Sequence, residues 1–141
     1  MIWASGYPSK LKKLITLQKR AIRGINGVGR FHRSTDLFKE DRLLKLPDIC
    51  HMQLITFMFR HRHGMLPKRF DTYFKTKEQI HQYEIRTKTN YQSSTCRSNT
   101  RLYSAMVLGP KLWNSLPQKF KIMDSLVTFK ISYKQFLISG Y

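Results

Sequence analysis

The most apolar stretch of the chain, at residues 47–59, reads PDICHMQLITFMF. A helix built from it carries apolar side chains on most of its sides, which is typical of a helix buried in a protein core. Pro47 suits a first helical turn, because its missing N–H has no acceptor within the helix there. Gly64 follows as a stop signal. The stretch therefore predicts a core helix against which the rest of the chain packs.

A short apolar helix is expected directly before this stretch. Ser34-Thr35-Asp36 is a helix-capping signature, since such side chains accept hydrogen bonds from free backbone N–H groups. The helix that it opens should run through the apolar residues Leu43, Leu44 and Leu46. Together, the two segments predict core helices over residues 35–63.

An amphipathic basic helix is predicted over residues 11–25, ended or weakened by Gly24 and Gly27. Apolar residues recur at the spacing of one helical face: Leu11, Leu14, Ile15, Ile22 and Ile25. Basic residues occupy the opposite face: Lys12, Lys13, Lys19, Arg20 and Arg23. A charged face is often merely solvated, but here no acidic residue is interspersed.

The carboxy-terminal half alternates between polar and apolar segments. Residues 83–106 are rich in Ser, Thr and Asn and predict an extended or loop region, with at most a weak β-hairpin that pairs 84–89 with 101–106. Gly109-Pro110 is expected to break the chain before a short turn or helix that carries Trp113 and ends at Leu116-Pro117. A last helix is predicted over residues 125–138, capped by Ser125.

These patterns predict a mainly α fold: one small helical domain over residues 1–141. The hydrophobic content of 41% is too high for a disordered basic tail. The two cysteines make no disulfide framework, no signal peptide is recognisable, and no apolar run approaches the roughly 20 residues of a membrane span. We therefore expect an intracellular protein, nuclear or cytoplasmic, with no membrane association.

The charge balance points to a polyanionic partner. Lys and Arg number 26 against 8 Asp and Glu, a formal net charge of +18, and residues 1–33 contain no acidic residue. RNA or DNA, contacted through its phosphates, is the leading partner for such a surface.

The candidate nucleic-acid-binding residues form two groups. The first comprises the bases of the predicted amino-terminal helix: Lys12, Lys13, Lys19, Arg20 and Arg23. The second is a cationic cluster in the run Arg60-His61-Arg62-His63, joined by Lys68 and Arg69. Phe70, Tyr73 and Phe74 lie beside this cluster as rings on which bases could stack. Aromatic residues at helical spacing more often belong to a core, so we assign binding to the charges and the rings to the fold.

Catalytic signals are not found in the sequence. Nucleotide transfer needs carboxylates clustered on metal ions, and no two of the Asp residues are adjacent: Asp36, Asp41, Asp48, Asp71 and Asp124. Cys50, His61 and His63 invite a zinc hypothesis but lack the paired, short spacing of zinc ligands. Gly24, Gly27 and Gly29 lack the context of a phosphate-binding loop. We predict no catalytic residues, no metal site and no cofactor, and no enzyme activity of the chain on its own.

Two distant motifs carry a family resemblance. The runs Leu17–Arg23, LQKRAIR, and Gly109–Pro117, GPKLWNSLP, are similar to the segment beyond the polymerase thumb in LINE-type, jockey-like non-LTR retrotransposon reverse transcriptases. Further landmarks follow in the same order: Leu37-Phe38, Asp48-Ile49, Gln53, Phe57-Met58, Leu66-Pro67, His81, Tyr83, Ser104, Ser125-Leu126 and Phe129-Lys130. The run Glu84-Ile85-Arg86-Thr87 departs from the family pattern by a shifted basic residue, and the palm aspartates are not encoded.

The resemblance implies a carboxy-terminal fragment that holds template RNA or target DNA while another part of an RNA-directed DNA polymerase does the chemistry. Two alternatives remain open. One is a structural or protein-interaction module whose positive surface docks on an acidic partner, including the missing polymerase domains. The other is a decayed element copy with no selected activity.

Overall fold

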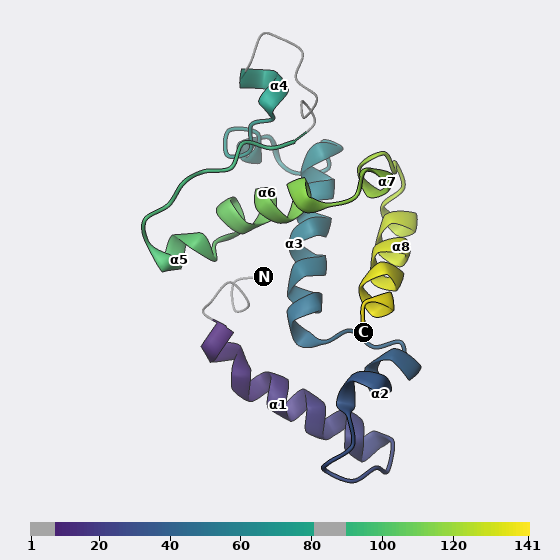
Figure 1. The fold of residues 1–141 in the computed structure, drawn as a ribbon. Coiled ribbons are helices and arrows are strands. Elements are labelled where there is room, and N and C mark those ends of the chain that lie inside the picture. Colours follow the sequence, from purple (N-terminus) through teal and green to yellow (C-terminus); the bar gives the residue numbers. More distant parts are fainter. Residues whose placement is uncertain (1–7, 81–89) are drawn as a thin grey trace.

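The structure is a computed structural model that describes residues 8–80 and 90–141, and it is mainly helical (Figure 1). The helices follow one another in this order: α1 Pro8–Ile25, α2 Ser34–Glu40, α3 Leu46–Arg62, a 3-10 helix η2 Lys68–Phe70, α4 Lys77–Ile80, α5 Asn99–Leu102, α6 Ala105–Ser115, α7 Gln118–Lys121 and α8 Leu126–Ser139. In the described ranges, β pairing is confined to one isolated bridge, Thr76 with Tyr91. None of the described helices is both long and apolar enough to cross a membrane.

Helix α3 is the centre of the fold, as its apolar sequence predicts. Helix α6 crosses it and α8 lies beside it (Figure 1). Ile55, Met58 and Phe59 of α3 are almost fully buried, in one hydrophobic cluster with Trp113 and Phe129. The Phe59 and Phe129 ring centroids are 4.4 Å apart. Aromatic contacts of this kind contribute beyond the area that they bury, so α3, α6 and α8 form the main core.

Helix α3 begins and ends where its sequence predicts. Pro47 lies in its first turn. At the other end Gly64 has φ +64°, a conformation that glycine adopts without steric cost. The Gly64 N–H donates to His61 O at 3.1 Å and the Met65 N–H donates to Arg60 O at 2.8 Å. These two bonds form a Schellman motif, which satisfies the last carbonyl groups of the helix.

Helix α1 confirms the predicted basic helix and extends it back to Pro8. Gly27, at φ +62°, ends it with the same kind of motif, in which the Val28 N–H donates to Arg23 O at 3.0 Å. Helices α1 and α2 pack through a second, small cluster of Ile22, Leu37 and Phe38. The two helices lie beyond the amino end of α3 (Figure 1).

Helix α2 begins within one residue of the expected start, but the expected cap and the expected end are wrong. Ser34 is inside the helix and buried, and the residue before it, Arg33, makes no side-chain cap. The helix ends at Glu40, and Arg42 takes a left-handed φ of +52°. Leu43 and Leu44 therefore lie in the connection to α3, and Leu46 begins α3 itself. The side chain of Gln18 on α1 stabilises this connection, because its amide donates to Leu44 O and accepts from the Leu46 N–H, both at 2.9 Å.

Gly109-Pro110 does not break the chain, contrary to the sequence prediction, and lies inside α6 with both residues buried. The reason is the crossing with α3. A Cβ added at Gly109 would lie 2.9 Å from Met58 Sδ, so the bare glycine allows the two helices to come this close. The predicted end at Leu116-Pro117 is confirmed, since Leu116 is the C-cap of α6.

The polar region contains more helix than expected. Residues 81–89, which hold the first strand of the hairpin considered above, lie outside the described residues. The proposed second strand, 101–106, is wrong: these residues belong largely to α5 and α6. Tyr91 is buried and is held by Asn114 on α6. The Tyr91 N–H donates to Asn114 Oδ1 at 2.9 Å, and Asn114 Nδ2 donates to Tyr91 O at 2.8 Å.

The carboxy-terminal helix is confirmed as α8, Leu126–Ser139. Ser125 caps it, as its Oγ accepts from the Thr128 N–H at 3.5 Å. Phe129 and Tyr133 are the buried residues of this helix.

Candidate nucleic-acid interface

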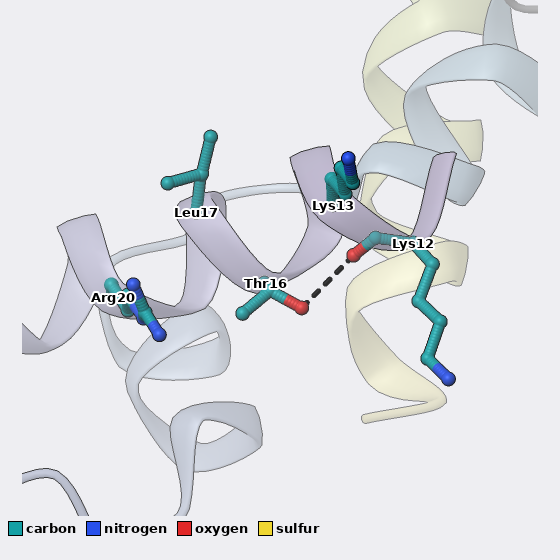
Figure 2. A pocket seen from close by; sticks show the side chains of 5 residues that line it. All are labelled: Lys12, Lys13, Thr16, Leu17 and Arg20. Carbon is teal, nitrogen blue, oxygen red and sulfur yellow. Dashed lines mark hydrogen bonds between the residues drawn. The ribbon is translucent and has the colours of Figure 1, made fainter. Parts of the chain in front are cut away.

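Helix α1 presents its basic residues to solvent. Lys12, Lys13, Lys19 and Arg20 are exposed, and Arg23 is half-buried; we call these five residues the α1 basic set. Figure 2 shows three of them on the outer surface of the helix, where Lys12, Lys13 and Arg20 line a shallow pocket together with Thr16 and Leu17. Thr16 Oγ1 bonds back to Lys12 O at 2.9 Å, so it stays on the helix surface.

The positive charge of this surface is not neutralised by neighbouring acids. In the described part of the chain, no carboxylate forms an ion pair with a residue of the α1 basic set. The side chains of Lys12, Lys13, Lys19 and Arg20 therefore point to solvent rather than inward against carboxylates. Such a surface attracts counterions, which a polyanion can displace.

Arg23 has a second task. Its Nε donates to His32 O at 2.8 Å, which ties the loop between α1 and α2 to the end of α1. Two more basic residues of this loop, Arg30 and Arg33, are exposed. Sequence reasoning did not select them, although they fall in the same acid-free stretch.

The second predicted group is exposed as well but lies apart from the first. Arg60 and Arg62 are at the carboxy end of α3, and Lys68 and Arg69 are on η2; we call these four residues the α3 basic set. Helix α1 adjoins the opposite end of α3 (Figure 1). Seventeen residues separate these ends, or about 25 Å of helix. The structure therefore forms two basic surfaces, not one.

The apolar face of α1 is only partly covered. Ile22 is buried and Leu11 and Ile15 are half-buried, but Leu14 and Ile25 are exposed, Ile25 by 78%. Helix α2 has only seven residues and is too short to cover the length of α1. The predicted apolar stripe therefore packs against the protein along its centre and is exposed to solvent along one edge.

The rings beside the α3 basic set belong mainly to the fold, as interpreted from the sequence. Phe74 is buried, and Phe70 packs edge-on against Phe57 with ring centroids 5.4 Å apart. Tyr73 differs, with 51% of its surface exposed.

Two histidines of the predicted cationic run turn inward, contrary to the sequence reading. The His63 ring stacks on Phe59 with centroids 4.1 Å apart. The His61 side chain is only 9% exposed, and its Nδ1 lies 2.8 Å from Tyr91 Oη, while its Nε2 is 3.8 Å from Asp71 Oδ1. Burial lowers the pKa of His61, and the nearby Asp71 carboxylate opposes this shift. Arg60 and Arg62 alone supply the surface charge of this run.

No group of three or more His, Cys, Asp or Glu side chains in the described ranges is placed to hold a metal ion. Cys50 is the fifth residue of α3 and His61 lies in its last turn, about 16 Å apart along the axis. The two side chains cannot ligate one ion.

Comparison of the chain with protein-family models, with curated proteins and with solved structures finds no match.

Proposed function

We propose that the chain is a non-catalytic nucleic-acid-binding segment that contacts the phosphates of RNA or DNA through the α1 basic set. The supporting observation is the solvent exposure of Lys12, Lys13, Lys19 and Arg20 on one helix without carboxylate partners in the described structure. Phosphate contacts release condensed counterions, so affinity falls steeply with salt and depends little on sequence.

The family origin that we propose is the region beyond the thumb of a LINE-type retrotransposon reverse transcriptase. Its support is the ordered set of motifs in the sequence, and in this reading bond formation belongs to other parts of the polymerase. Gln18 of the first motif holds the connection to α3, and Trp113 and Asn114 of the second motif organise the core and Tyr91. Residues of both motifs therefore stabilise the fold, in addition to those that lie on the surface.

The test is reversal of the exposed α1 charges to Glu: Lys12, Lys13, Lys19 and Arg20. We expect the affinity for a mixed-sequence RNA or DNA oligonucleotide to fall at least about tenfold. Each lost phosphate contact reduces the magnitude of the slope of log K against log[salt] by about 0.7–0.9, so the loss of four contacts should reduce it by about 3. Fluorescence anisotropy over a salt series measures both quantities.

The matched control reverses four lysines on α6, α7 and α8: Lys111, Lys119, Lys130 and Lys134. This variant carries the same net charge as the first but keeps the α1 basic set. An equal loss of affinity in both variants would contradict a localised binding face. Reversal of the α3 basic set then reports whether that second surface takes part, since the two surfaces are farther apart than the screening length of about 8 Å at physiological salt.

A protein-interaction role is the second candidate, and one observation favours it. An apolar groove of about 230 Å³ lies between α1, α2 and the start of α3, lined by residues that include Ile25, Leu43 and Ile49. If a partner covers this groove in the assembled protein, amide hydrogens of α1 should exchange quickly in the isolated chain and slowly in the complex. Slow exchange in the isolated chain, together with salt-dependent nucleic-acid binding, supports the first candidate instead.

A further inference from the structure

Phe31 is the most exposed large apolar side chain in the described structure, with 89% of its surface accessible. Leaving such a side chain in water forgoes the favourable free energy of burying it. Single exposed apolar residues are common on protein surfaces. Exposure alone therefore does not indicate a binding role for the ring, and the residues around it decide the interpretation.

Two arginines lie next to Phe31: Arg30 contacts its ring, and Arg23 on α1 bonds the loop that carries it. The Arg30 guanidinium carbon lies 4.8 Å from the centroid of the Phe31 ring, a cation–π contact on one side of it. The loop is fastened by two hydrogen bonds to His32: the Arg23 Nε donates to His32 O at 2.8 Å, and the His32 N–H donates to Gly29 O at 3.0 Å. Phe31 is therefore positioned at the end of the α1 basic set.

The exposed Tyr73 shows by contrast why Phe31 stands out. Tyr73 follows η2 and lies near Phe70, with ring centroids 6.4 Å apart, and about half of its surface is covered. Phe31 has almost no comparable burial.

We propose that Phe31 is a stacking platform for one unpaired base of a single strand of RNA or DNA whose phosphates lie along the α1 basic set. This inference rests on the proposed function and adds to it a contact that only single strands can make. Stacking on an aromatic side chain strengthens binding and accepts any base, because every base has a flat π face. Bases in a duplex are already stacked on each other, so the ring adds nothing to duplex binding. Arg30 holds the ring from one side and leaves the rest of it open to the base.

The experiment compares an oligothymidylate of about twelve nucleotides, within the usual range of single-strand sites, with the duplex formed by the same strand and its complement. Phe31→Ala should weaken single-strand binding by about tenfold, the equivalent of about 1.4 kcal/mol, and leave duplex binding and the salt slope unchanged. The control is Ile122→Ala, since Ile122 is also exposed, by 68%, but lies between α7 and α8. It should change neither affinity.

A second variant, Phe31→Trp, keeps an aromatic ring at this position, and the fluorescence of the new tryptophan reports directly on stacking. Its added fluorescence should be quenched by the single strand and much less by the duplex, while Ile122→Trp should respond equally to both. Unchanged single-strand affinity in Phe31→Ala, equal losses on both probes, or an unquenched Phe31→Trp overturns the stacking role and leaves the proposed function intact. If the unsubstituted chain binds neither probe at low salt, the proposed function itself fails.

Discussion

At the scale of single residues, His61 belongs to a run that the sequence predicts to be cationic and exposed, yet its side chain lies in the interior. The sequence places it between two arginines, yet its ring lies against Phe74 and Tyr91, with ring centroids 5.1 and 5.5 Å away. Its Nε2 is buried and makes no hydrogen bond in the described structure. The charged groups that face it are Asp71, whose side chain is 67% exposed and therefore screened by solvent, and Arg62. Desolvation dominates, and the neutral imidazole is favoured in the folded state.

This environment predicts a pH dependence of stability. Burial lowers the pKa of His61 in the folded state below the ordinary histidine value of about 6.5, so the unfolded chain binds more protons just below that pH. The free energy of unfolding should therefore decrease as pH falls through the unfolded pKa of about 6.5. Urea denaturation at pH about 7.5 and about 5.5 measures the difference, which His61→Gln should reduce. His32→Gln, at an exposed histidine, should keep the full difference; a His61→Gln variant that also keeps it would contradict this assignment.

At the scale of helices, the crossing of α3 and α6 depends on one missing side chain. Gly109 faces Met58, which is fully buried and cannot turn away into solvent. Pro110 beside it lacks an N–H and so forgoes one hydrogen bond of α6, but its ring is buried in the core. Tight packing with α3 thus stabilises a helix whose local sequence disfavours it.

Two matched substitutions test this account. Gly24 lies inside α1 with no atom within 4 Å of an added Cβ, so Gly24→Ala should increase the free energy of unfolding by about 0.5–1 kcal/mol through helix propensity. Gly109→Ala makes the same local gain but places its Cβ 2.9 Å from Met58 Sδ, and overpacking of about 1–3 kcal/mol should leave a net loss of about 1 kcal/mol. Chemical denaturation of both variants measures these changes. Equal stabilisation by the two alanines would show that the contact with Met58 adapts freely.

At the scale of the whole molecule, Tyr141 joins the two hydrophobic clusters. It follows α8, which packs in the main core, and its ring packs against the small cluster of α1 and α2. Its hydroxyl donates to Asp48 Oδ2 at 2.6 Å and accepts from the Lys45 N–H at 2.9 Å, both at the start of α3. The Lys45 ammonium lies 3.7 Å from the ring centroid. Burial and the Asp48 carboxylate raise the pKa of Tyr141, so its hydroxyl keeps the proton that it donates to Asp48.

Removal of this hydroxyl should loosen the α1–α2 unit from the rest. Tyr141→Phe leaves the Lys45 N–H and one carboxylate oxygen without their partner, and we expect a loss of about 1–3 kcal/mol in the free energy of unfolding. Thermal and urea denaturation measure it. Tyr73→Phe, at a half-exposed tyrosine, is the control and should change stability by less than about 0.5 kcal/mol. If the Tyr141 variant is equally unaffected, the two clusters are held together by other contacts.

Features with local causes were predictable from the residues around them. A helix that is apolar on most sides must be buried, so α3 was predictable as the centre of the fold. The basic face of α1, the glycine stop at Gly64 and the Ser125 cap of α8 follow equally from neighbouring residues. The net charge of +18 and its acid-free first stretch are likewise properties of the sequence alone.

Contacts between residues far apart in the chain depend on how the helices pack. Gly109-Pro110 remains helical because Met58, fifty-one positions earlier, fills the space beside it. Tyr91 is buried because the Asn114 amide bonds its backbone from α6. The two basic sets lie at opposite ends of α3, and Phe31 stays in solvent beside Arg30, because the packing of α1, α2 and α3 leaves them there. Contacts through space depend on the positions of several helices at once, and no local sequence pattern encodes those positions.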